Sequence, residues 1–141
     1  MSAADLDEVA ALEAVAFPTP WSRASFADEL DRAHARAFVL RRDAALIGYL
    51  VAWVLFDVAE LLVVAVQPTE RGHGHGRHLV THLFDVARRE GATRIQLEVR
   101  AGNTPAIALY ERLGFHRVGL RSGYYQDNGE DAVLMDCELG A

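Results

Sequence analysis

Hydrophobic residues recur along this chain in two spacings, one typical of helices and one typical of strands. Residues 5–17 carry apolar side chains every three or four positions, which predicts a helix with one buried face. A second helix is expected to begin after Ser22, because serine hydroxyls accept hydrogen bonds from the first turn of a helix. Residues 37–40 and 46–56 are apolar runs on either side of a polar turn, and they predict two neighbouring strands.

The rest of the chain continues with alternating strands and helices. An apolar run at residues 59–66 predicts a third strand, and helical spacing from about Gly74 to Glu90 predicts a long amphipathic helix. The remaining predicted elements are a strand at residues 94–100, a helix capped by Asn103 or Thr104, and strands at residues 115–120 and 132–139. The resulting order, ααβββαβαββ, is typical of a mixed, partly parallel sheet covered by helices.

The composition narrows the class of protein. With 141 residues, of which 51% are hydrophobic and 24% charged, the chain has the size and balance of one soluble globular domain over residues 1–141. Its longest apolar run, residues 46–56, is too short to cross a bilayer, and no signal-peptide pattern opens the chain. A single cysteine, Cys137, fits a reducing compartment, so we expect a cytoplasmic protein without membrane contacts. The net charge of −6 disfavours nucleic acid and suits a cationic partner, such as an amine or a basic peptide.

The segment with the clearest chemistry is a glycine-rich loop, Arg71 to Arg77, between the third strand and the long helix. Glycines let backbone N–H groups approach a ligand closely. The start of a helix adds unpaired N–H groups and the positive end of its dipole, and the two arginines add charge. The loop therefore predicts a phosphate site, with a ligand-free surface turn as the alternative. The chain has no lysine and its glycines are spaced two apart, so the loop is neither a P-loop nor a dinucleotide fingerprint.

Within this loop, Arg71, Gly74 and Gly76 form the pattern R-x-x-G-x-G. This pattern, together with later segments, resembles the GNAT superfamily of N-acetyltransferases, and among them the RimI type, which acetylates the α-amines of protein N-termini. The later segments are Leu97-Glu98-Val99-Arg100-Ala101-Gly102-Asn103, Ala106-Ile107-Ala108-Leu109-Tyr110 and Leu113-Gly114-Phe115. The resemblance covers nearly the whole chain.

The resemblance implies a GNAT fold of the α/β class, with a mixed, mostly antiparallel sheet flanked by helices and a central parallel pair that splays apart. The family begins with a strand before its first helix. Only residues 1–4 are available for that strand here, so we expect it to be reduced or absent.

The resemblance also implies a reaction. Acetyl-CoA is the expected co-substrate, without a metal, and the acetyl group passes directly, in a ternary complex, to the N-terminal α-amine of a protein such as a ribosomal protein. Two alternatives stay open. The acceptor could be a small-molecule amine or an internal lysine, or the chain could bind acyl-CoA without catalysis.

Two residues match the family's catalytic positions. The resemblance assigns Glu98 as the general base, acting through water, and Tyr110 as the general acid that protonates the CoA thiolate. A carboxylate can serve an α-amine, whose pKa of roughly 8 lies about 2 units below that of a lysine amine. The residues alone also allow Glu98 to be a solvent-facing strand residue paired with Arg100, and Tyr110 to be a core aromatic.

The resemblance further implies contacts with both substrates. The expected cofactor-binding residues are Val64, Ala65, Val66, Arg71, Gly72, His73, Gly74, His75, Gly76, Arg77 and Asn103. Asn103 has an alternative role as a plain helix cap. The residues expected to bind the acceptor are Trp21, Tyr124 and Tyr125.

Two alternatives involve other chemistry. Four histidines cluster in and after the loop, at positions 73, 75, 78 and 82, but no carboxylate or cysteine completes a metal-binding set. Cys137 could carry an acetyl group in a two-step mechanism. Its place in the last apolar strand instead favours a buried, unreactive thiol.

Overall fold

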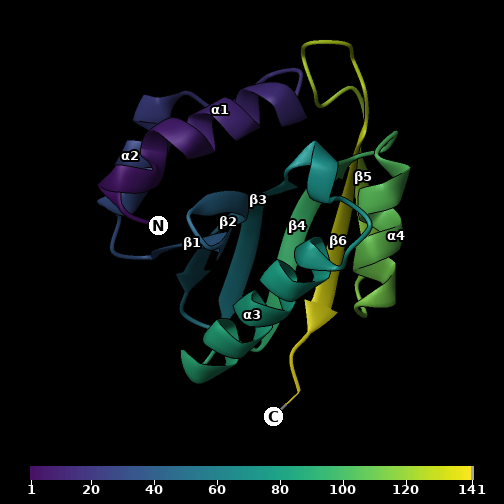
Figure 1. Ribbon diagram of the computed structural model, residues 1–141. Coiled ribbons are helices and arrows are strands. Elements are labelled where there is room, and N and C mark those ends of the chain that lie inside the picture. The colour runs from purple at the N-terminus through teal and green to yellow at the C-terminus, as the bar shows by residue number, and fades with distance from the viewer. Residues whose placement is uncertain (141) are drawn as a thin grey trace.

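The strands form one mixed sheet in the computed structural model, which describes residues 1–140 (Figure 1). They are β1 (Ala35–Arg42), β2 (Ala45–Leu55), β3 (Val58–Val66), β4 (Arg94–Arg100), β5 (His116–Arg121) and β6 (Ala132–Glu138), and they lie side by side in the order β1-β2-β3-β4-β6-β5. β3 and β4 are parallel, and the other neighbouring pairs are antiparallel. The predicted sheet, mostly antiparallel with a central parallel pair, is confirmed.

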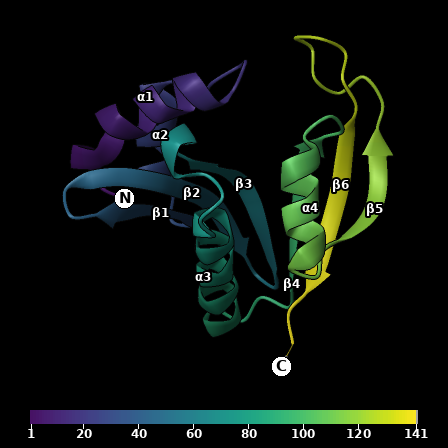
Figure 2. The same ribbon diagram turned by 45° about the vertical axis from the view of Figure 1, so that its right-hand side comes forward.

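Helices cover both faces of this sheet (Figure 2). The α-helices are α1 (Leu6–Ala16), α2 (Arg23–Leu30), α3 (His75–Arg89) and α4 (Thr104–Arg112), with short 3-10 helices at Ala3–Asp5 and Pro68–Glu70. α1 and α2 pack on one face, and α3 and α4 pack on the other. Ser22 caps α2 as predicted, because its hydroxyl accepts a hydrogen bond of 3.1 Å from the Ser25 N–H. Within residues 1–140, no helix is long and apolar enough to cross a membrane.

β2 is buried on both faces, which explains its nearly continuous apolar sequence. Tyr49 and Val51 face α1 and α2, whereas Leu50 and Ala52 face α3, and all four side chains are fully buried. A strand covered on both sides has no polar face and loses the alternation of a half-buried strand. β4 keeps strict alternation because the face that carries Glu98 is only partly covered.

The parallel pair separates part-way along its length. Within residues 1–140, β3 and β4 pair as far as Leu61 and Leu97 and no further. At the same point the register between β2 and β3 shifts, which leaves Leu62 as an extra residue in β3. Such a bulge bends its strand and increases the local twist. The splayed pair expected from the resemblance is therefore present.

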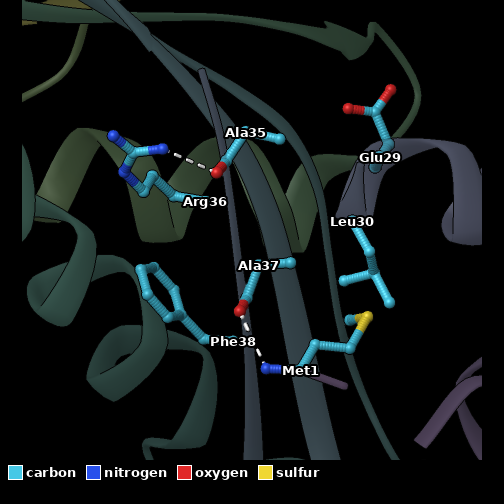
Figure 3. A pocket seen from close by; sticks show the side chains of 7 residues that line it. All are labelled: Met1, Glu29, Leu30, Ala35, Arg36, Ala37 and Phe38. Atoms are coloured by element: carbon cyan, nitrogen blue, oxygen red, sulfur yellow. Dashed lines mark hydrogen bonds between the residues drawn. The ribbon is translucent and has the colours of Figure 1, made fainter. Parts of the chain in front are cut away.

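The described residues contain no strand before α1, in agreement with the expectation that the family's first strand is reduced or absent. Instead, the Met1 ammonium group donates a hydrogen bond of 3.0 Å to the Ala37 carbonyl on the outer edge of β1. A hollow of about 260 Å³ lies beside this contact (Figure 3). It is lined by Met1, Glu29, Leu30, Ala35, Arg36, Ala37 and Phe38, none of which is a predicted site residue.

β1 is longer than the predicted residues 37–40 at both ends, because Ala35, Arg36, Arg41 and Arg42 also pair with β2. The three arginines at its ends made the apolar run look shorter than the strand. The Arg41 guanidinium binds the carboxylates of Asp5 and Glu8 at 2.7 and 2.9 Å, so its charge is matched outside the sheet.

Glu13 is a buried acid that the sequence analysis missed. Its side chain is 1% exposed in α1, and its carboxylate accepts hydrogen bonds from the Tyr49 hydroxyl and, at 3.0 Å, from the Trp21 N–H. Burial raises the pKa of this carboxyl, and the two hydrogen bonds oppose the rise. The carboxylate thereby ties α1 to the sheet and to the end of the α1–α2 loop, where Trp21 lies.

Glu13→Ala should lower the free energy of unfolding by about 2–4 kcal/mol, because it leaves one buried and one half-buried donor unpaired and opens a cavity. Urea denaturation at neutral pH measures this change. Glu13→Gln, which keeps an acceptor oxygen in the same place, is the matched variant and should lose about 1 kcal/mol. Equal stability of the two variants would show that the carboxylate oxygens contribute nothing.

Candidate active site

The glycine-rich loop turns the chain from β3 into α3. Gly72 and Gly74 have φ angles of 83° and 81°, in the left-handed region that glycine adopts without strain. Gly74 is the N-cap of α3, and no side chain within residues 1–140 caps this helix. The N–H groups of its first turn therefore remain available to a ligand, at the positive end of the helix dipole.

The charged side chains of the loop differ in their surroundings. Arg71 and Arg77 are exposed, and neither makes an ion pair with another described residue. His75 turns back instead, with its Nε2 atom 3.5 Å from a carboxylate oxygen of Glu70. The two arginines thus add positive charge beside the free N–H groups, whereas the His75 ring packs against its own loop. This arrangement fits a diphosphate.

Beyond the bulge, the end of β3 has a strand partner on one side only. Val64, Ala65 and Val66 pair with β2, and no described strand pairs with them on the β4 side. Gly48 of β2 lies so close to them that an added Cβ atom would stand 2.6 Å from the Ala65 carbonyl oxygen. The backbone of residues 64–66 is therefore held firmly from β2 while its other edge can bind a ligand.

Glu98 is the first polar residue of β4 beyond the last pair with β3. One of its carboxylate oxygens lies 3.4 Å from the Arg121 guanidinium of β5. Hydrogen bonding to this carboxylate, and then its negative charge, raise the pKa of the Tyr124 phenol, because both favour the protonated form. Glu98 therefore lies on the α1 and α2 face of the sheet, with an arginine and a tyrosine beside it. Because helices cover this face only partly at β4, it is called the open face below.

The alternative pairing of Glu98 with Arg100 is wrong. Arg100 binds Asp127 at 2.8 Å and Glu130 at 3.3 Å, both in the loop between β5 and β6. Its guanidinium also lies 4.0 Å from the centre of the Tyr125 ring. These contacts hold the β5–β6 loop against β4. Arg121, and not Arg100, is therefore the arginine that contacts Glu98.

Tyr110 approaches from α4, on the other face of the sheet. Its ring is 6% exposed and packs against Phe115, with ring centres 5.6 Å apart. The alternative that Tyr110 is a core aromatic residue is thus correct for its ring. The hydroxyl has no hydrogen-bond partner among the described residues, and the pKa of the phenol is raised, mainly by burial and also by Tyr125. A raised pKa keeps the phenol protonated at neutral pH, as a proton donor requires.

Two loops meet over the open face. Tyr124 and Tyr125 lie edge to face with ring centres 5.1 Å apart, in the β5–β6 loop. Trp21 is half-buried on Phe26 at the end of the α1–α2 loop. The Thr19 hydroxyl donates a hydrogen bond of 3.0 Å to Asp127, which joins the two loops.

The other predicted residues have structural roles or different surroundings. Asn103 caps α4, since its side-chain oxygen accepts a hydrogen bond of 3.3 Å from the Ala106 N–H. No group of three or more His, Cys, Asp and Glu residues in positions 1–140 could hold a metal ion. His82 packs edge to face against Phe38, with ring centres 4.6 Å apart. Cys137 is buried, and burial raises the pKa of its thiol, which disfavours the reactive thiolate.

Comparison with known proteins shows which class of protein has this fold and this site. Residues 6–115 match the acetyltransferase (GNAT) family, so the chain belongs to this family. It is an acetyl-CoA-dependent N-acetyltransferase. Its sequence is similar to that of the Escherichia coli ribosomal protein bS18-alanine N-acetyltransferase, with 37% identity over 133 residues, 93% of this chain and 89% of that protein. An N-alpha-acetyltransferase RimI from Mycobacterium tuberculosis is 38% identical, over 99% of this chain and 90% of that protein.

Solved structures agree with this assignment. The crystal structure of the ribosomal-protein-S18-alanine N-acetyltransferase from Escherichia coli superimposes with a TM-score of 0.92 at 34% identity, covering 100% of this chain and 92% of that one. A NatC complex solved with a Gag peptide and CoA has a TM-score of 0.84 at 25% identity, covering 96% and 91%.

Gly74→Ala should weaken acetyl-CoA binding about tenfold, because a left-handed alanine costs about 1–2 kcal/mol and shifts the first N–H groups of α3. Titration calorimetry measures the dissociation constant. Gly91→Ala is the matched control, since Gly91 has a φ of 88° and no atom within 4 Å of an added Cβ. If both variants bound acetyl-CoA equally well, the loop would not be the diphosphate site.

Proposed function

We propose that this protein transfers the acetyl group of acetyl-CoA to the N-terminal α-amine of another protein, by direct attack in a ternary complex in the cytoplasm. One observation carries this proposal. β3 and β4 stop pairing beyond Leu61 and Leu97. In this proposal the free edge of β3, the glycine-rich loop, Glu98 and Tyr110 surround the opening that the two strands leave. The relatives that act on the alanine of ribosomal protein bS18 support a protein terminus as the acceptor.

In this proposal the CoA arm lies along the glycine-rich loop and the free edge of β3. Arg71, Arg77 and the first N–H groups of α3 bind the diphosphate. The backbone of residues 64–66 hydrogen-bonds to the pantetheine amides and to the acetyl carbonyl, where preorganised N–H groups stabilise the negative charge that develops. Acetyl-CoA supplies a thioester, whose carbon is open to attack by an amine. Asn103 and the remaining loop residues, Gly72, His73, His75 and Gly76, flank this arm.

Proton transfer is divided between the two faces of the sheet. Glu98 accepts a proton from the attacking amine through water, as the new N–C bond forms. Tyr110 donates its phenolic proton to the thiolate as the C–S bond breaks, and solvent then restores it. Glu98 and Tyr110 approach from opposite faces of the sheet. Glu98 therefore reaches the attacking amine, and Tyr110 reaches the departing sulfur.

The acceptor enters over the open face in this proposal, between Trp21 on one loop and Tyr124 and Tyr125 on the other. A free α-amine suits a carboxylate base, because its pKa of roughly 8 makes the neutral form accessible at neutral pH. A lysine amine, with a pKa of roughly 10.4, would need a stronger base or a desolvated site.

A competition assay tests this function directly. The enzyme, acetyl-CoA and a mixture of acceptors are incubated together, and mass spectrometry identifies the products. The mixture contains peptides with free N-terminal alanine or serine, N-blocked peptides with an internal lysine, and small amines. Acetylation should fall on the free α-amines. Preferential acetylation of lysine or of small amines would overturn the proposed acceptor while leaving the family assignment in place.

Tyr110→Phe should lower kcat by roughly a hundredfold with little change in KM for acetyl-CoA, because only the transferable proton is lost. Steady-state kinetics with an N-terminal alanine peptide measure both constants. Cys137→Ala serves as the comparison, since direct transfer does not use the thiol, and it should keep kcat within about twofold. Wild-type turnover in the Tyr110→Phe variant would show that Tyr110 is not the general acid. An inactive but folded Cys137→Ala variant would favour a two-step route.

A further inference from the structure

Glu60 is an acid on the open face of the sheet that the proposed reaction has not yet used. It stands in β3 opposite Gln96 of β4, one pair before the two strands separate. Alternation places it on the same face as Glu98. Its side chain is half-buried, yet it makes no ion pair or hydrogen bond with any residue from 1 to 140. An unpaired, half-buried carboxylate is costly, so a partner is expected to reach it.

The groups around Glu60 are those that surround Glu98. Burial raises the pKa of Glu60, the charge of Glu98 raises it further, and Arg121 opposes the rise. The charges of Glu98 and Glu60 both contribute to the raised pKa of Tyr124. The charge of Glu98 also contributes to the raised pKa of the nearby Tyr125. Two carboxylates and Arg121 therefore lie together beside the opening between β3 and β4.

We propose that Glu60 is a second carboxylate of the acceptor site and that Glu60 and Glu98 together bind the α-ammonium group of the incoming protein before it loses its proton. This inference rests on the proposed function. A protein N-terminus arrives largely as an ammonium ion at neutral pH, and its three N–H donors suit two carboxylates. Arg121 occupies one side of Glu98 only, so Glu60 supplies the remaining acceptor oxygens.

Glu60 and Glu98 have separate tasks in this arrangement. Glu98 lies beyond the last β3–β4 pair, beside the opening in which the thioester is held. Through water it takes first the proton that converts the ammonium group to a neutral amine, which passes on to solvent, and then the proton released as the N–C bond forms. Glu60 lies before that point, further from the reacting carbon, and it keeps the ammonium group in place without entering the bond changes. Its loss should therefore weaken acceptor binding more than it slows the chemical step.

The experiment compares the binding of two peptides to the CoA complex, in which no acetyl group can be transferred. One peptide begins with alanine, and the other is its desamino counterpart, in which a propionyl group replaces the alanyl residue. Calorimetry at neutral pH should give the wild type a preference of tenfold or more for the alanyl peptide. Glu60→Gln should lose about tenfold in affinity for the alanyl peptide and none for the desamino peptide.

Glu111→Gln on the exposed surface of α4 is the matched control and should keep the wild-type preference. The CoA affinity and thermal unfolding of Glu60→Gln show whether its fold is intact. A folded Glu60→Gln variant that retained the full preference would overturn the role of Glu60 alone. A wild type with no preference for the alanyl peptide would overturn the proposed α-amine acceptor itself, so the two failures are distinguishable.

Discussion

The central constraint on this molecule is the end of hydrogen bonding between β3 and β4. A parallel pair in the middle of a sheet normally continues along both strands, since every buried backbone group needs a partner. Here pairing stops at Leu61 and Leu97, where the extra residue Leu62 bends β3. Beyond that point β3 remains paired to β2 and β4 to β6, so neither strand is loose. The sheet thus presents unpaired backbone groups from a rigid frame, and an extended amide-bearing ligand can satisfy them.

The two faces of the sheet contribute different chemistry at this opening. The α3 and α4 face supplies a helix N-terminus for anions and a buried phenol that keeps its proton. The α1 and α2 face leaves β4 partly uncovered and carries acids, arginines and aromatic rings. An anionic substrate and a cationic substrate can therefore approach from opposite sides without competing for the same charges. This separation follows from the strand alternation, because neighbouring residues of one strand point to different faces.

The order of elements followed from the sequence because hydrophobic spacing reports burial, and burial decides most of this fold. The strand 94–100 was predicted with its bounds, since one covered face gives strict alternation. β1 was predicted too short because charged residues at a strand end look like a turn. The class of the site followed from the glycine-rich loop and the segments after Leu97, whose local pattern resembles that of a family.

Contacts between distant segments did not follow from the sequence. The sequence alone left open that Arg100 pairs with its near neighbour Glu98. Asp127 and Glu130 come instead from a loop about thirty residues away, and they match the fork of donors on Arg100 better. Glu13 and Glu60 were missed because an acid in an apolar segment is usually solvated. One signal was available for Glu13, which is four residues after Val9 on the buried stripe of α1. The burial of each acid depends on side chains that only the folded chain brings together.

The hydrogen bond from Thr19 to Asp127 has a mechanical consequence. Asp127 is also bound to Arg100, so the α1–α2 loop, the β5–β6 loop and β4 are connected through one carboxylate. Neither loop can swing outward alone without breaking this clasp or pulling on the strand that bears Glu98. The clasp is exposed to solvent and therefore weak, so under the proposed function an arriving polypeptide can displace it, and it can form again when the product leaves. Under the proposed function, entry of the acceptor is thereby linked to the position of the strand that bears Glu98.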